Sequence, residues 1–381
     1  MTQIVAVRSA FPAHRYPQAD ITRAVAALAG IEPGGAGGSA RTQRALLERL
    51  HANAGVDTRH TAFPLADYGA LGAASNDRYI EEATALGERA LRGALAQSGL
   101  AADDLDLLIV TSVTGVAVPS IDALLMPRLG LRADVKRLPV FGLGCVAGAA
   151  GLARLHDYLL GWPGHTAALL AVELCSLSLP RASVTTADLV ASALFGDGAV
   201  ALVATGTRPP RRPRGRSSRS SRLSQASRAP AAPSSALLPR IVATRSEVYP
   251  DSEGALGWRL SADGFRIVLT AELAEVVERR LGGSVTGFLA EYGLTIDDIG
   301  TWICHPGGPK VLDAAQRALK LPAAALASSR QSLAQAGNMS SASVLHILEL
   351  TVADDAPAAG SFGMMIGLGP GVSAELILLR W

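Results

Sequence analysis

Short apolar runs alternate with longer segments of mixed polarity along most of the chain. The runs at residues 107–111, 167–172 and 199–203 are apolar at nearly every position, as expected of strands that are covered on both faces. Residues 135–141 lead through a Gly-rich turn into a longer segment, which predicts a helix from about 146 to 160. Strands and helices that alternate at this spacing predict an α/β protein.

The same pattern returns after residue 240. It predicts strands near 301–304, 363–366 and 375–379 and helices near 271–281, 310–320 and 341–350. Each half ends in a Gly-rich turn and an apolar strand, which begin at Phe195 in the first half and at Gly367 in the second. This echo predicts an internal duplication.

A segment of different composition, residues 207–239, separates the two halves. It is rich in Arg, Pro, Ser and Ala and has no periodicity, which predicts a disordered insertion. We therefore divide the chain into an N-terminal half (1–206), this insertion and a C-terminal half (240–381).

The insertion also dominates the charge. Nine arginines and no acidic residue lie between Arg208 and Arg240, so removing them turns the net charge of +2 into −7. A basic run can bind nucleic acid or anionic lipid, but no aromatic residue is interleaved here to stack on bases. We expect a solvated insertion and no nucleic-acid partner.

Composition narrows the class of protein. The chain has 381 residues, 49% of them hydrophobic, and only 3 cysteines, which are too few and too scattered for a disulfide framework. The N-terminus predicts a strand and lacks the basic region and apolar core of a signal peptide. With no apolar run of the ~20 residues that a membrane span needs, we expect a cytoplasmic protein with reduced thiols and no membrane insertion.

Cys145 is the first candidate for chemistry. It follows a predicted strand and begins a predicted helix, and Gly142 and Gly144 permit a sharp turn between the two. Because a helix N-terminus favours thiolate over thiol, this position suits a nucleophile. It suits a buried structural cysteine equally well on local grounds.

His305 and Asn338 are the other two candidates. His305 ends a predicted strand before Pro-Gly-Gly-Pro, a rigid setting in which an imidazole can act as a base or a hydrogen-bond donor. Asn338 is predicted at a helix start, where asparagine is ordinarily an N-cap. Each alone fits a structural role better, but the order Cys, His, Asn predicts a catalytic set.

Four separated motifs turn this set into a family resemblance. They are the segment around Cys145, HPGGPK at His305, GNMSSAS at Asn338 and GLGPG at residues 367–371. In this order they resemble the type III polyketide synthases, the chalcone and stilbene synthase-like enzymes of the thiolase superfamily. The resemblance covers nearly the whole chain outside residues 207–239.

The resemblance implies a thiolase-like duplicated five-layer αβαβα core that acts as a homodimer. It implies that Cys145 takes a starter acyl group from coenzyme A and that His305 helps to hold the thiolate. His305 and Asn338 would bind the thioester carbonyl of malonyl-CoA, so that decarboxylation yields an enolate that attacks the Cys145 thioester. The substrates would be acyl-CoA and malonyl-CoA, and no metal or redox cofactor is expected.

The resemblance also assigns pocket residues. Phe195 corresponds to a gatekeeper between the coenzyme A tunnel and the cavity. Ile267 falls where the family has a second gatekeeper phenylalanine, a departure for which Phe265 could compensate. Arg59 and Lys310 would contact coenzyme A. The cavity-lining and cyclisation-pocket positions are Val113, Thr114, Cys175, Ser178, Gly257, Ser340, Gly367, Gly369, Pro370 and Gly371.

Two positions bear on the product. Plant chalcone synthases have threonine at the positions of Val113 and Cys175, and bacterial tetrahydroxynaphthalene-forming enzymes carry an extra cysteine near Val113, which is absent here. The pattern at residues 171–177 is more similar to alkylresorcinol and alkylpyrone synthases. We therefore predict a fatty acyl starter and an alkylpyrone or alkylresorcinol product, with an aromatic-starter chalcone-type or a tetrahydroxynaphthalene-type synthase as alternatives.

Other classes of function stay open at this point. A β-ketoacyl-acyl carrier protein synthase III-like enzyme uses the same three residue types and differs in taking a carrier-bound extender. A thiolase-fold binding protein without turnover is disfavoured by the intact Cys-His-Asn set. A Cys-His-Asn protease is disfavoured because Cys145 lacks protease-like flanks.

Overall fold

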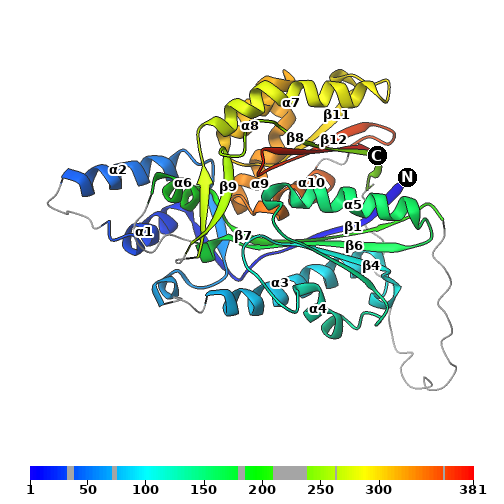
Figure 1. Ribbon diagram of the computed structural model, residues 1–381, viewed down its shortest axis with the longest axis horizontal. Coiled ribbons are helices and arrows are strands. Elements are labelled where there is room, and N and C mark those ends of the chain that lie inside the picture. Colours follow the sequence, from blue (N-terminus) through cyan, green and yellow to red (C-terminus); the bar gives the residue numbers. More distant parts are fainter. Residues whose placement is uncertain (32–37, 71–74, 179–184, 209–237, 262–263, 355–356) are drawn as a thin grey trace.

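The computed structural model describes residues 1–31, 38–70, 75–178, 185–208, 238–261, 264–354 and 357–381. Helices and sheet alternate in layers, from α7 (Glu272–Ala290) at the top of Figure 1 to α3 (Ser75–Ser98) and α4 (Ile121–Leu129) at the bottom. The expected insertion at 207–239 lies outside the described residues except at its ends.

One nine-stranded sheet runs through the described residues in the order β11-β12-β13-β8-β1-β7-β6-β4-β5. The strands are β1 (Thr2–Ala10), β4 (Leu107–Thr111), β5 (Lys136–Val140), β6 (Thr166–Leu174), β7 (Asp197–Thr205), β8 (Arg240–Val248), β11 (Ile299–Cys304), β12 (Phe362–Gly369) and β13 (Ser373–Arg380). The two halves of the sheet meet at β1 and β8, whose antiparallel pairing joins Thr2 to Ile241 and Gln3 to Arg240.

Strand order and direction repeat between the halves. In the first half β1 is antiparallel to β7, β7 is antiparallel to β6, and β6 is parallel to β4. In the second half β8, β13, β12 and β11 follow each other with the same sequence of directions. This repeat confirms the duplicated core, and β5 extends the first half by one parallel strand.

Two helices fill the space between the halves of the sheet. α5 (Ala147–Gly161) and α10 (Ser343–Asp354) share one apolar cluster with residues of β1, β4, β6, β11, β12 and β13. The first seven residues of α5 are all buried. Small residues make this possible, because a Cβ on Gly148 would overlap the carbonyl oxygen of Ser341. Both central helices therefore begin beside each other.

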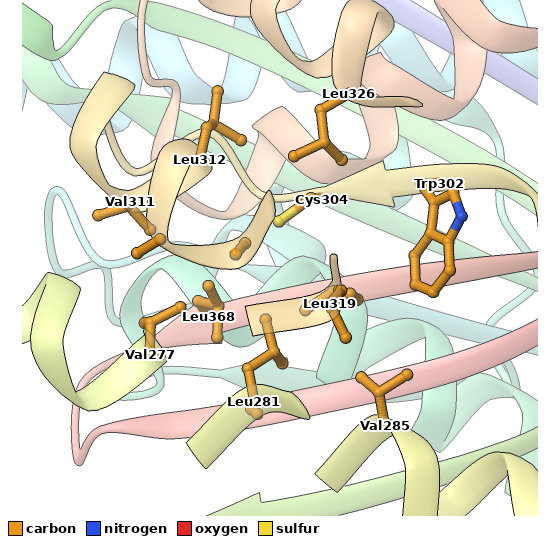
Figure 2. Packing of buried hydrophobic residues seen from close by; sticks show 14 of the residues in the cluster. Val277, Leu281, Val285, Trp302, Cys304, Val311, Leu312, Leu319, Leu326 and Leu368 are labelled. Atoms are coloured by element: carbon orange, nitrogen blue, oxygen red, sulfur yellow. The ribbon is translucent and has the colours of Figure 1, made fainter. Parts of the chain in front are cut away.

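The outer layers complete the five-layer αβαβα arrangement. α3 and α4 pack on the outer face of the first half of the sheet. α7 and α8 (Pro309–Leu319) pack on that of the second half. Figure 2 shows the latter cluster, in which Cys304 at the end of β11 lies among Val277, Leu281, Leu312 and Leu326. This packing anchors the residue directly before His305.

Smaller elements gather at one end of the core, on the left of Figure 1. They are α1 (Gln18–Leu28), α2 (Gly38–Ala52), α6 (Thr186–Leu194), the hairpin of β2 (His14–Pro17) with β3 (Thr58–Thr61), and the hairpin of β9 (Leu256–Ser261) with β10 (Gly264–Leu269). Among the described helices, none is long and apolar enough to cross a membrane.

The predicted elements agree with these bounds to within a few residues, except that the helix predicted near 271–281 continues to Ala290 and that two local differences occur. Asn338 does not begin a long helix: it precedes the short 3-10 helix η8 (Ser340–Ala342), and α10 starts at Ser343. Gly367 and Gly369 were expected in a loop but belong to the end of β12, so that the turn to β13 holds only Pro370 and its neighbours. Both segments contact the turn that carries Cys145, Gly369 at Val146 and Ser340 at the thiol.

Candidate active site

The candidate residues follow the ends of strands in both halves. Cys145 lies after β5, Cys175 directly after β6, and His305 directly after β11. Because β4, β5 and β6 are parallel, their carboxyl ends share one edge of the first half of the sheet, and the carboxyl ends of the parallel pair β11 and β12 share one edge of the second half. Open α/β sheets place ligand sites at such an edge.

The turn at Cys145 requires glycine. Cys145 lies in the 3-10 helix η4 (Gly144–Val146), and Gly142 and Gly144 have φ angles of 92° and 60°, which other residues rarely adopt. A Cβ on Gly144 would lie 2.7 Å from Cδ of Pro370, and one on Gly369 would lie 2.7 Å from the Val146 nitrogen. The β12–β13 turn therefore presses directly on the nucleophile turn.

Burial governs the charge of the thiol. Cys145 is buried, which raises its pKa to about 12; the Ser340 hydroxyl lowers this pKa, and the nearby Glu173 raises it. This direction is opposite to the one expected from the helix start alone.

Glu173 was not predicted from the sequence. It is buried near the end of β6, and its carboxylate accepts hydrogen bonds from Ser341 Oγ (2.5 Å), Val113 N (3.0 Å) and Thr114 Oγ1 (3.0 Å). Burial raises the pKa of Glu173 above its ordinary value. The only signal in the sequence was that one acidic residue stands inside an apolar strand. In the structure, Val113 and Thr114 donate hydrogen bonds that hold this carboxylate in place.

His305 has a ring with unsatisfied nitrogens. It is 2% exposed, and both Nδ1 and Nε2 lack a hydrogen-bond partner among the described residues. Its backbone N–H donates to Ile366 at 2.9 Å, one residue before Gly367, which packs on Val146 beside Cys145. Burial lowers the pKa of His305 to about 3, so the free imidazole is neutral. A buried polar ring without partners is costly, and a bound carbonyl or thiol would relieve that cost.

The Asn338 side chain is oriented by the backbone N–H of Ser340. It is buried, and its Oδ1 accepts a 2.9 Å hydrogen bond from Ser340 N, as in an Asx turn. This bond uses the amide oxygen and leaves the Nδ2 group to donate to a substrate oxygen. Ser340 in turn lies beside the Cys145 thiol, so the Asn338 turn borders the nucleophile.

Phe195 lies at the C-terminal end of α6 and faces a residue that the sequence analysis missed. Its ring centroid is 6.4 Å from that of Trp258 in β9. Trp258 pairs across the hairpin with Ile267, so both side chains lie on the same face. Trp258 thus supplies an aromatic neighbour where Ile267 departs from the family pattern. Gly257 precedes it, and the side chains of Ser178 and Phe265 lie outside the described part of the chain.

Arg59 does not have the expected role. It is 1% exposed, and its guanidinium donates to the carbonyl oxygens of Phe195 (2.5 Å) and Ser192 (2.6 Å) and to Gln18 Oε1 (2.8 Å). A side chain buried in this way cannot meet coenzyme A phosphates in solvent. Lys310 is exposed on the first turn of α8 and keeps its assignment as a prediction.

The remaining thiols are also buried. Burial raises the pKa of Cys175 well above its ordinary value and that of Cys304 to about 12. Cys175 lies within electrostatic range of Cys145, while Cys304 belongs to the core of the second half. No group of three or more His, Cys, Asp or Glu in the described ranges is placed to hold a metal ion.

Known proteins are similar to this chain over most or all of its length. Residues 39–209 match the family model "Chalcone and stilbene synthases, N-terminal domain", and residues 240–381 match the corresponding C-terminal domain. The chain is 52% identical over 382 residues to "1,3,6,8-tetrahydroxynaphthalene synthase" of Streptomyces peucetius subsp. caesius, which covers 100% of this chain and 93% of the relative. It is 32% identical to "Putative chalcone synthase" of Bacillus subtilis (strain 168), over 80% of each chain.

A solved structure gives the same result for the fold. The crystal structure of 1,3,6,8-tetrahydroxynaphthalene synthase from Streptomyces coelicolor A3(2), a bacterial type III polyketide synthase, matches with a TM-score of 0.83 and 27% identity. The match covers 100% of this chain and 99% of that chain.

Proposed function

Because the chain belongs to the chalcone and stilbene synthase family of type III polyketide synthases, we propose that it condenses malonyl-CoA units into an aromatic product of the tetrahydroxynaphthalene type. The observation that carries this proposal is the 52% identity with a tetrahydroxynaphthalene synthase over the full length of the chain. A naphthalene skeleton without alkyl substituents can be assembled entirely from two-carbon units, so malonyl-CoA can serve as both starter and extender.

This proposal prefers a product that the sequence analysis gave only as an alternative. The prediction of a type III polyketide synthase is confirmed, but the preference for a fatty acyl starter rested on a few local positions, namely Val113, Cys175 and the pattern at residues 171–177. The match to the Streptomyces peucetius relative covers 100% of this chain at 52% identity, and it supports the tetrahydroxynaphthalene alternative better.

In the proposed loading step, Cys145 attacks the thioester carbonyl of malonyl-CoA. The thiol proton passes to His305, the bond between sulfur and the carbonyl carbon forms, and coenzyme A leaves as a thiolate that recovers the proton. The neutral imidazole favoured by burial is the form that can accept this proton.

In the proposed extension step, a second malonyl-CoA loses carbon dioxide. The electron pair of the broken carbon–carbon bond forms an enolate, whose oxygen accepts hydrogen bonds from His305 and the Asn338 amide. The enolate carbon then attacks the Cys145 thioester, and the sulfur leaves. Because both donors are neutral, they stabilise the developing negative charge without the cost of burying a charge of their own.

Product analysis tests the proposal. The purified protein is incubated with malonyl-CoA alone and with malonyl-CoA plus acyl-CoAs of increasing length, and the products are identified by mass spectrometry. We expect tetrahydroxynaphthalene or its oxidation product from malonyl-CoA alone. Products that form only with a fatty acyl-CoA would contradict the proposal, and reaction only with malonyl-acyl carrier protein would indicate the carrier-dependent class.

Acyl-enzyme analysis tests the nucleophile. Cys145→Ala is expected to abolish both the acyl-enzyme seen by mass spectrometry and the product. Cys304→Ala, which removes a thiol from the core of the second half, should retain the acyl-enzyme.

We also propose a homodimer formed through the free edge of β5. This strand ends the nine-stranded sheet, and it and the following turn expose Leu138, Phe141 and Leu143 to 41%, 56% and 42%. An edge strand with exposed apolar side chains favours pairing with another chain. Sedimentation should show a dimer that Phe141→Glu weakens, and an unchanged dimer in this variant would place the interface elsewhere.

A further inference from the structure

Arg59 holds the C-terminal end of α6 from inside the protein. Its guanidinium donates to the carbonyl oxygens of Ser192 and Phe195. Because both residues lie at the end of α6, these oxygens accept no hydrogen bond from a following turn of the helix. A cation at this end also interacts favourably with the helix dipole. Arg59 comes from β3, so a separate element sets where Phe195 lies.

The backbone on either side of Phe195, which Arg59 holds, is hydrogen-bonded to the backbone of Asn338. Asn338 N donates to Leu194 O at 2.8 Å, and Gly196 N donates to Asn338 O at 3.0 Å, which makes a parallel bridge between Phe195 and Asn338. Gly196 and Gly337 permit this approach: a Cβ on Gly337 would lie 2.7 Å from Leu194 O. Two backbone hydrogen bonds therefore tie the gatekeeper Phe195 to Asn338, the predicted donor to the enolate.

The arginine side chain packs along this junction. A Cβ on Gly196 would lie 3.2 Å from Cβ of Arg59, and one on Gly337 would lie 3.6 Å from its Cδ. The aliphatic stem of Arg59 thus covers both glycines while its guanidinium caps α6. Removing this side chain would leave a gap at the bridge as well as unpaired carbonyls.

A buried carboxylate balances the charge of Arg59. Asp197 is 0% exposed, and its carboxylate accepts hydrogen bonds from Ala62 N and Ser176 N, both at 2.7 Å. Asp197 raises the pKa of Arg59, while burial lowers it to about 9, so the guanidinium stays charged at neutral pH. Ser176 directly follows Cys175, so the same hydrogen-bond network reaches the segment that carries this thiol.

We propose that Arg59 is a positioning residue that keeps gatekeeper Phe195 and Asn338 in a fixed relation, and thereby sets the rate of malonyl decarboxylation. The inference rests on the proposed function. Arg59 touches neither Cys145 nor the reacting carbonyl among its described contacts, so it acts through backbone geometry. Misplacing a catalytic group by about 1 Å can reduce a rate on the order of 100-fold.

Two substitutions and one control test this inference. Arg59→Met keeps an apolar stem and removes all donors, and Arg59→Lys keeps a charge but lacks the fork that reaches two carbonyls at once. Arg92→Met is the control, because Arg92 lies on α3 in an outer layer and pairs with Glu88. For each variant we would measure the rate of carbon dioxide release from malonyl-CoA, the KM for malonyl-CoA and the rate of acyl loading on Cys145.

We expect Arg59→Met to slow decarboxylation by roughly 10- to 100-fold while acyl loading and KM change far less. Arg59→Lys should lie between Arg59→Met and the wild type, and Arg92→Met should match the wild type. If Arg59→Met does not fold, Arg59→Lys alone carries the comparison.

Two results would overturn the inference. One is equal loss of loading and decarboxylation in a folded variant, which indicates general disruption. The other is wild-type decarboxylation in Arg59→Lys. Failure of the proposed function is distinguishable, because then the wild-type protein itself would not release carbon dioxide from malonyl-CoA.

Discussion

Ser341 donates a 2.5 Å hydrogen bond to Glu173, which joins the two halves of the duplicated core next to the nucleophile. Ser341 lies in η8, three residues after Asn338, while Glu173 lies near the end of β6, two residues before Cys175. The Glu173 carboxylate raises the pKa of Cys145, as burial does. Burial and Glu173 therefore both oppose ionisation of the thiol, and in the proposed mechanism His305 is the group that accepts its proton.

His305→Gln is predicted to raise the pH at which Cys145 reacts. In the wild type the thiol proton can pass to the buried imidazole, and the resulting ion pair stabilises the thiolate. Burial already raises the pKa of Cys145 to about 12 with His305 in place, so without an imidazole to accept the proton the thiol should react only at still higher pH. Alkylation by iodoacetamide across a pH series measures this shift, and an unchanged midpoint would contradict the assignment.

Asn338→Ala is predicted to impair decarboxylation more than starter loading. The substitution removes the Nδ2 donor and also the Oδ1 bond to Ser340, but it leaves Cys145 and His305 in place. Loss of one donor to a developing oxyanion typically costs about 100- to 1000-fold in rate. Carbon dioxide release and acyl-enzyme formation are measured separately. Equal losses in both would argue against a role at the enolate.

Trp258→Ala is predicted to relax the choice of starter. The Trp258 ring faces Phe195, and Ile267 beside it is smaller than the phenylalanine of the family pattern. Removing the indole should raise kcat/KM for medium-chain acyl-CoA relative to malonyl-CoA by about 10-fold or more, since each methylene admitted is worth roughly that factor. Trp162→Ala, on the surface after α5, is the control and should leave the ratio unchanged.

Two glycines in helices are predicted to respond oppositely to alanine. Gly148→Ala introduces a Cβ against the Ser341 carbonyl between the central helices and should destabilise the protein by about 1–3 kcal/mol. Gly283→Ala in α7 meets no atom within 4 Å and should stabilise it by about 0.5–1 kcal/mol through helix propensity. Denaturant unfolding measures both. Equal effects would show that the close packing of α5 on η8 is not what requires Gly148.

The sequence by itself determined the order of the elements and the identity of the candidate catalytic set. Apolar runs such as residues 107–111 predicted β4 with its observed bounds, because a strand buried on both faces shows its burial in local composition. The glycines beside Cys145 and the turns at His305 and Asn338 were visible for a similar reason, since backbone conformation restricts residue type locally.

The tertiary structure alone decided the charge and partners of these residues. Arg59 was expected at a solvent-exposed phosphate, but its burial and its bonds to Ser192 and Phe195 depend on segments more than a hundred residues away. The pairing of Trp258 with Phe195 and of Glu173 with Ser341 has the same origin. Desolvation and hydrogen bonding are properties of packed neighbours, and no local pattern records which distant segments become neighbours.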